Sequence, residues 1–176
     1  MSAQDMITTP VTDAFRASMR LVAASVSLVT ARDETGVWHG MAVTSAGSLS
    51  MDPPSMMVAV NRSASIHPVI ARTGYFTLNL MDEGHAALLE RFSRSDMRDQ
   101  RFIPEDWTAA DPAGPILKGA LCAHVCTVAE AHDFGTHTVF FGKVTDVILQ
   151  NPIAQNPAPI LWLNGKRSSV AQQPKP

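Results

Sequence analysis

A hydroxyl-rich segment between residues 40 and 65 carries the side chains with the clearest potential for chemistry. Two groups of polar side chains follow two apolar runs, and their members are Thr44, Ser45, Ser48, Ser50, Asn61, Ser63 and Ser65. Hydroxyls and backbone amides that are held between rigid strands donate hydrogen bonds in fixed directions, which suits a phosphate-bearing cofactor. Arg62 adds a guanidinium that can pair with phosphate through two parallel hydrogen bonds. The segment therefore predicts a nucleotide-type cofactor site.

The same hydroxyls could instead belong to an ordinary polar loop, where serine and threonine stabilise turns. Two flanking features favour the binding interpretation. The stretch Asp52-Pro53-Pro54 stiffens the connection, and Ser65 stands at the expected start of a short helix, where backbone amides point outward. The chain has no glycine-rich dinucleotide fingerprint, no phosphate-binding P-loop and no G-x-S-x-G elbow. A nucleotide site here must therefore use another architecture.

A second candidate is the sequence Gly135-Thr136-His137, which is followed by Gly142-x-Val144. One interpretation is a hairpin turn with a histidine at the start of a strand. The other is a functional histidine that a tight turn holds in place. Residue types alone leave both interpretations open.

Cys122, His124 and Cys126 would share one face of a strand, which suggests a metal site until distances are considered. Four strand steps separate the two cysteine Cα atoms by roughly 13 Å. A disulfide needs less than about 7 Å, and two thiolates on one zinc ion must each approach it to about 2.3 Å. We therefore predict that both cysteines are small buried core residues and that the chain holds no metal.

Apolar periodicity and turn residues predict the elements that must position these groups. The predicted helices span residues 13–23, 65–73 and 84–92. The predicted strands span residues 25–31, 37–44, 56–61, 75–80, 116–131, 137–149 and 160–163. Residues 45–52 are predicted to form a loop, and residues 93–114 a long surface excursion.

Turns separate the predicted strands more often than full helices do, which favours an antiparallel β-barrel with attached helices, a mainly-β α+β fold. The length of 176 residues suits one domain, which we place at residues 12–167 between flexible tails at 1–11 and 168–176.

The composition excludes several classes of protein. A net charge of −2 offers no electrostatic reason to expect nucleic acid. No apolar run approaches the roughly 18 residues that span a bilayer, and residues 1–10 lack the pattern of a signal peptide. We therefore expect a cytoplasmic protein without a membrane segment.

Taken together, the motifs resemble those of the short-chain flavin reductase family across about residues 12–165. The hydroxyl-rich segment contributes Gly40-Met41-x-Val43-x-Ser45, Ser48-x-Ser50-x-Asp52-Pro53-Pro54 and Val60-Asn61-x-Ser63-x-Ser65. Similar motifs lie elsewhere, at Phe15-Arg16, Ser25-x-x-x-Val29-Thr30, Phe76-x-x-Asn79-Leu80, Phe92-Ser93, Arg101-Phe102 and Trp107.

The resemblance implies an FMN-binding split β-barrel that forms a homodimer and binds FMN or FAD near the dimer interface. It implies that residues 44–50 line the flavin ring and ribityl chain, that residues 61–65 hold the phosphate end, and that Phe92 and Ser93 close over the site. His137 would orient the nicotinamide of NADH or NADPH as the catalytic residue. Members of the family usually carry aspartate at the position of Thr136, and Asp133 is close enough in the turn to replace it.

The implied activity is an NAD(P)H-dependent flavin reductase, which passes hydride to flavin and supplies reduced flavin to a partner monooxygenase. One alternative is a flavin-binding electron carrier without turnover on the same fold. Another is an interaction domain that binds no cofactor, but this alternative would not explain why so many hydroxyl side chains occur around the same loops.

Overall fold

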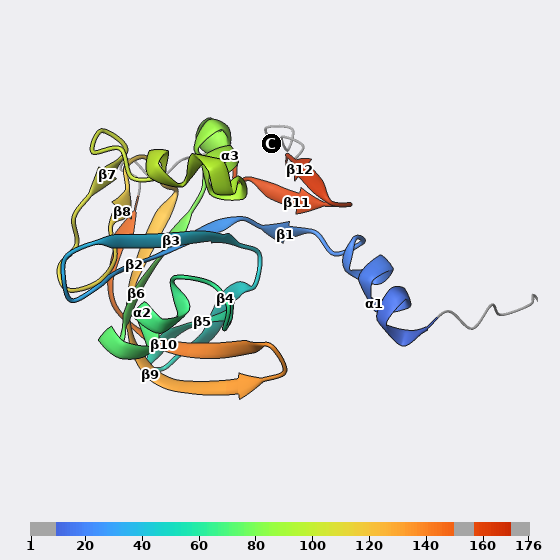
Figure 1. Cartoon of the computed structure of the whole chain (residues 1–176), viewed down its shortest axis with the longest axis horizontal. Helices are drawn as coiled ribbons and strands as arrows, with labels where there is room; N and C mark the ends of the chain where they lie inside the picture. Colours follow the sequence, from blue (N-terminus) through green and yellow to red (C-terminus); the bar gives the residue numbers. More distant parts are fainter. Residues whose placement is uncertain (1–9, 150–156, 170–176) are drawn as a thin grey trace, which may run out of the picture.

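A seven-stranded antiparallel sheet forms the body of the chain, and the computed structural model describes residues 10–149 and 157–169. Its strands follow the order β3-β2-β6-β9-β10-β5-β4 (Figure 1). Their bounds are β2 (Ser27–Arg32), β3 (Trp38–Val43), β4 (Ala46–Met51), β5 (Pro54–Asn61), β6 (Tyr75–Leu80), β9 (Cys122–Phe134) and β10 (His137–Leu149). All neighbouring pairs are antiparallel, which confirms the predicted mainly-β fold with attached helices.

The remaining elements are short and lie around this sheet. The helices are α1 (Val11–Met19), α2 (His67–Thr73) and α3 (Ala86–Ser93), with 3₁₀ turns η1 (Glu83–His85) and η2 (Ser95–Gln100). A small sheet has the order β1-β11-β12, from β1 (Ala24–Ser25), β11 (Leu161–Leu163) and β12 (Lys166–Ser168), while β7 (Trp107–Thr108) pairs with β8 (Ile116–Leu117). Across the described ranges, no helix has the length and apolar character to cross a bilayer.

The sheet is open between β3 and β4, its two edge strands, and we call this opening the seam. Residues 44–45 carry the chain directly from one edge to the other. The strands therefore form a barrel that is split along the seam, as the family resemblance implied.

Two clusters of buried side chains form the core on opposite faces of β2. Val29 and Ala31 face the first cluster, which lies inside the barrel with Val58, Val60, Ile70, Phe76 and Phe140. Leu28 faces the second cluster, which lies beneath α3 with Met81, Leu88, Leu89, Phe92 and Trp107. Because successive residues of a strand point to opposite faces, β2 is buried on both sides.

Buried polar side chains bind β8 and the residue before it to the sheet. Asn79 Oδ1 accepts from Leu117 N at 2.8 Å, and its Nδ2 donates to Leu28 O at 3.3 Å. Thr30 Oγ1 donates to Pro115 O at 2.7 Å. Asn79 and Thr30 are fully buried, and each of these polar atoms has a partner, without which its burial would be costly.

The predicted surface excursion at 93–114 is partly wrong, because its second half packs into the core. Trp107 is only 3% exposed, and Ala113 is 1% exposed. The polar residues around Trp107 and Ala113 give the segment the composition of a surface loop. Only its long-range contacts reveal that these two side chains are buried. The predicted strand at 116–131 is likewise divided into β8 and β9.

The predicted loop at residues 45–52 is also wrong, since most of it forms β4. Its hydrogen bonds go to β5, where Ala46 pairs with Val58 and Ser48 with Met56. An edge strand with one open side tolerates small and polar residues, so its composition resembles a loop. β5 begins at Pro54, so the stiff proline pair leads directly into a strand that starts earlier than the predicted residue 56.

Two helix boundaries differ from their predictions. The helix predicted at 13–23 runs from Val11 to Met19, and none of its residues is buried. Figure 1 shows it projecting away from the body of the chain. The helix predicted to begin with Ser65 as its cap has Ile66 at that position, without a side-chain capping hydrogen bond. Pro68 lies in its first turn, where its missing amide proton costs no hydrogen bond.

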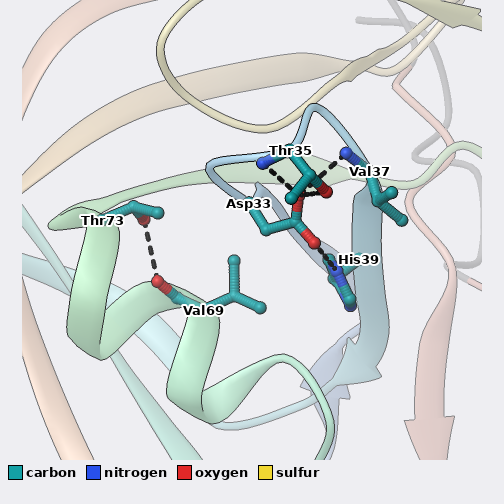
Figure 2. A network of polar contacts seen from close by, with 6 residues as sticks. All are labelled: Asp33, Thr35, Val37, His39, Val69 and Thr73. Atoms are coloured by element: carbon teal, nitrogen blue, oxygen red, sulfur yellow. Dashed lines mark hydrogen bonds and ion pairs between the residues drawn. The ribbon is translucent and has the colours of Figure 1, made fainter.

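Figure 2 shows a polar network at the turn between β2 and β3. Asp33 Oδ1 accepts from Thr35 Oγ1 at 2.7 Å and from the backbone amides of Thr35 and Val37, each at 2.9 Å. Asp33 Oδ2 lies 2.9 Å from His39 Nε2. These hydrogen bonds, that of the Thr35 hydroxyl first and that of His39 second, hold the pKa of Asp33 well below its usual range. Asp33 is therefore ionised at neutral pH and joins the turn to β3.

We predict that Asp33→Asn lowers the free energy of unfolding at neutral pH, because the amide keeps one acceptor oxygen but loses the charge beside His39. Because the pKa of Asp33 is lowered in the folded state, its charge contributes its full stabilisation at any pH above the pKa of the unfolded carboxyl, about 3.9. This stabilisation is lost as the pH falls below that value. Urea unfolding at pH 7, 5 and 3 should show equal deficits at the first two values and a smaller deficit at the third. Asp13→Asn, on exposed α1, serves as the control. A deficit that grows towards pH 3 would contradict this assignment.

Candidate functional site

The seam, the end of β5 and the start of β10 meet at one end of the sheet. Ser45 Oγ donates to Ala59 O at 2.7 Å, and Ala59 N donates to Ser45 O at 3.2 Å. Asn61 lies two residues further along β5 and is the register partner of His137. Ala59, Asn61 and His137 therefore face the same side of the sheet. Segments that are far apart in the sequence thus bring Thr44, Ser45, Asn61 and His137 into one region.

A cavity of about 200 Å³ opens beside the seam. Its walls come from β3, α3 and the C-terminal hairpin, and its lining residues are Val26, Ala42, Val43, Thr44, Leu89, Ser93 and Trp162. Apolar side chains form most of this lining, while Thr44 and Ser93 add hydroxyls. Such a surface suits a flat aromatic ring with polar edges.

Phe92 and Ser93 have different positions, although they are adjacent in the sequence. The Phe92 ring is 6% exposed and packs on Phe102 and Trp107, with centroid separations of 5.6 and 6.0 Å. A Cβ at Gly40 would lie 2.9 Å from this ring, so the glycine makes room for it. Phe92 thus supports the cavity wall from behind, and Ser93 is the member of the pair that reaches the cavity.

Ser48 and Ser50 lie along β4, away from the cavity. Ser48 pairs with Met56, and Ser50 pairs with Ser55 near the β4–β5 turn. The Ser50 hydroxyl donates to Asp52 O and accepts from Asp52 N, each at 3.1 Å. Five strand steps separate Ser50 from Ser45, a distance of roughly 16 Å. Only an elongated ligand would reach from the cavity to Ser50.

The segment at residues 61–65, which we call the β5 loop, is organised by its own hydrogen bonds. Asn61 Oδ1 accepts from Ser63 N and from Ser63 Oγ, both at 2.9 Å. Arg62 Nη2 donates to Gly135 O at 2.6 Å, and Arg62 N donates to Thr136 O at 3.0 Å. Ser65 is exposed beside them. The β5 loop is therefore attached to the β9–β10 turn, and its Arg62 keeps further N–H donors for a ligand.

His137 is exposed at the start of β10, and Thr136 lies against it. Thr136 Oγ1 is 2.9 Å from His137 Nδ1. Asp133 does not make this contact, because its carboxylate is engaged by Thr138 at 2.5 Å and by Arg62 at 3.4 Å. The hydrogen bond from Thr138, followed by the charge of Arg62, holds the pKa of Asp133 below its usual value. The neighbour that orients His137 in this chain is thus a hydroxyl.

The two cysteines lie on β9, and both are free thiols. Cys126 is buried as predicted, but the prediction is wrong for Cys122, which is only half-buried at the start of the strand. Burial raises the pKa of Cys126 to about 12 and raises that of Cys122 as well. Gly142 is the close neighbour of Cys126, and a Cβ there would lie 2.8 Å from the cysteine Cβ. This glycine of the predicted motif therefore serves packing. Within the described residues, no three histidine, cysteine or acidic side chains form a group suited to a metal ion.

Sequence reasoning missed Trp162, which the structure places in the cavity wall. Its strand β11 pairs with β1, so that Trp162 is opposite Ala24. This pairing joins the two ends of the described chain, and no local pattern signals it. Thr138 was also missed, because its register position on β10 becomes meaningful only once β9 and β5 are paired on either side.

Comparison with known proteins gives consistent matches over most of the chain. The family model described as flavin reductase like domain matches residues 19–171. FMN reductase (NADH) RutF 2 of Methylorubrum extorquens strain PA1 is 35% identical over 131 residues, which cover 74% of this chain and 76% of that protein. The reductase component of the FADH(2)-dependent resorcinol hydroxylase of Rhizobium sp. strain MTP-10005 is 32% identical over 158 residues, 86% of this chain and 83% of that protein.

The solved structure of the styrene monooxygenase flavin reductase from Pseudomonas putida S12 has the same fold. It matches with a TM-score of 0.77 and 29% identity, and the match covers 92% of this chain and 98% of that chain. The seam, the β5 loop and the β9–β10 turn all lie inside the matched region of the family model.

Proposed function

Because this chain belongs to the flavin reductase-like domain family, we propose that it is an NAD(P)H-dependent flavin reductase that supplies reduced flavin to a partner monooxygenase. The supporting observation is the convergence of the seam cavity, the β5 loop and His137 at one end of the sheet. The names of the relatives support both halves of the proposal, since one is an NADH-dependent FMN reductase and another is the reductase component of a hydroxylase. These two relatives support FMN and FAD respectively, so both flavins belong to the proposal.

The residues of the site fit a flavin. The apolar walls of the seam cavity would contact the ring, and Thr44, Ser45 and Ser93 would meet its polar edge. Arg62 would pair with the phosphate end, beside the hydroxyls of Ser63 and Ser65. In its bound form the flavin supplies the hydride-accepting chemistry, so the chain needs no nucleophile of its own.

His137 would act by positioning the nicotinamide. Its Nδ1 is held by the Thr136 hydroxyl, which fixes the plane of the imidazole ring. The ring is exposed, and its second nitrogen is therefore available to a ligand. Holding two reactants in a productive arrangement removes much of the entropic cost of their encounter.

A homodimer would complete this site. The seam cavity of about 200 Å³ is smaller than the roughly 300–1,000 Å³ of typical ligand sites. Large apolar side chains are exposed on α1, at the β9–β10 turn and at the end of β10, and they include Val11, Phe15, Met19, Phe134, Val147 and Leu149. Large apolar side chains that are exposed in one chain are available to be covered by a second copy. We place the dimer in the cytoplasm, where free thiols such as Cys122 and Cys126 persist.

The purified protein should oxidise NADH or NADPH in a reaction that depends on added FMN or FAD and saturates with it. Loss of reduced-nicotinamide absorbance measures this rate. Absence of oxidation together with stoichiometric co-purified flavin would instead favour the electron carrier without turnover. Absence of both oxidation and flavin binding would contradict any flavin-based function.

In the same assay, His137→Ala should raise the nicotinamide KM by about 5- to 30-fold, because the variant loses one hydrogen bond to that substrate. Its affinity for flavin should be nearly unchanged. His132→Ala, which removes another exposed histidine of the same hairpin, is the matched control and should behave like the wild type. Equal losses of flavin and nicotinamide binding would overturn the role of His137.

Light scattering after size-exclusion chromatography should give the mass of a dimer. Phe15→Glu should shift the mass to that of a monomer, because the side chain is 61% exposed in one chain and would place a charge in the interface. Ala17→Glu adds the same charge to another side of α1 and should leave the dimer intact. A monomeric wild type would rule out the dimeric site.

A further inference from the structure

A chain of four polar side chains connects α2 to the β5 loop. His67 Nε2 lies 2.7 Å from Thr138 Oγ1, and Thr138 Oγ1 lies 2.5 Å from Asp133 Oδ1. Asp133 Oδ2 lies 3.4 Å from Arg62 Nη1. The chain therefore runs from the first residue of a helix, through adjacent strands, to the guanidinium beside the proposed phosphate end.

The chemistry of these groups fixes the direction of the hydrogen bonds. An ionised carboxylate can only accept, so Thr138 must donate its single hydroxyl proton to Asp133. The Thr138 oxygen can then only accept from His67, which requires a proton on His67 Nε2. All donors thus point from the helix towards Asp133, and Arg62 donates to the same carboxylate from the other side.

The middle of this chain is buried, whereas its end is exposed. Thr138 is 4% exposed, and the His67 ring packs on Phe140 with a centroid separation of 5.5 Å. The side chains of Asp133 and Arg62 are 63% and 49% exposed. A rigid interior group therefore sets the orientation of a carboxylate that would otherwise rotate freely in solvent.

Packing alone does not require a hydroxyl at position 138. The inward-facing residues around it are apolar: Val60 is its register partner on β5, and Phe140 follows it on the same face of β10. A valine has nearly the same shape and would fill the same space. The hydroxyl is needed because of its two polar partners, one on each side.

We propose that His67 and Thr138 are positioning residues that orient Arg62 through Asp133. Arg62 is also bonded to Gly135 O and, through its amide, to Thr136 O. Fixing it therefore holds the β5 loop and the turn that carries His137 as one unit. The phosphate end of the flavin site and the nicotinamide side of the site would then keep a constant separation. The role of His67 and Thr138 in flavin binding rests on the proposed function. The coupling of the β5 loop to the β9–β10 turn does not.

The first test compares Thr138→Val with Thr138→Ser in fluorescence titrations with FMN and with FAD. For whichever flavin the wild type binds, the affinity of the valine variant should be roughly 3- to 30-fold weaker. This is the range expected for a residue that acts through a network. The serine variant keeps the hydroxyl and should stay within about twofold of the wild type. Thr77→Val, which removes another buried hydroxyl bonded to Gly114 O, controls for a general loss of stability and should leave flavin affinity unchanged.

A pair of substitutions at residue 67 tests the donor at the start of the chain. His67→Gln places an amide N–H near the position of Nε2 and should preserve binding. His67→Phe keeps the contact with Phe140 but removes the donor, and it should reproduce the loss seen in Thr138→Val.

A readout without cofactor separates this proposal from the proposed function. Nitrogen NMR should show a proton on His67 Nε2, and amide hydrogen exchange should show that Thr138→Val speeds exchange at Arg62 N, which donates to Thr136 O. Both results with no flavin binding would refute the proposed function while preserving the coupling. An unprotonated Nε2, unchanged exchange at Arg62, or equal flavin affinities for the valine and serine variants would overturn the proposal.

Discussion

The open seam between β3 and β4 is the constraint on which the rest of the structure depends. A closed barrel would satisfy every backbone group along both edges, but here the chain crosses from one edge to the other through residues 44–45. The exposed flank of β3 must then be covered by other elements. α3 supplies Leu89 and Ser93, and the C-terminal hairpin supplies Trp162. A gap in the hydrogen-bonded sheet thus becomes a cavity with apolar walls.

Two kinds of support hold the walls of that cavity in place. Behind α3, the Phe92 ring packs on Phe102 and Trp107, and the Arg101 guanidinium lies 5.3 Å from its centroid. Beneath the sheet, Asn79 binds β8, and the Thr30 hydroxyl binds the residue before it. The polar contacts depend on the direction of their hydrogen bonds, while the aromatic contacts depend on how the rings fit together.

The sequence predicts best those elements whose bounds are set by a local pattern of apolar and turn residues. β6 begins after Gly74 and has the predicted bounds, because alternating apolar residues and a left-handed glycine mark it. The polar edge strand β4 was mistaken for a loop, since only its pairing with β5 identifies it. At the site, the motifs indicated the hydroxyls, Arg62 and His137. They did not reveal Trp162 or the link from His67 to Thr138, which spans 71 residues and depends on strand register.

The burial of the two cysteines has a consequence for the durability of the protein. The thiolate is the form of cysteine that attacks disulfides and reacts with oxidants, and a pKa of about 12 leaves almost none of it at Cys126. A protein that releases reduced flavin works close to a source of oxidants. Cys126 is buried in the core and Cys122 is half-buried, and burial raises the pKa of both thiols, so neither presents a readily ionised sulfur to such oxidants. The protein should therefore tolerate repeated turnover without covalent damage at these positions.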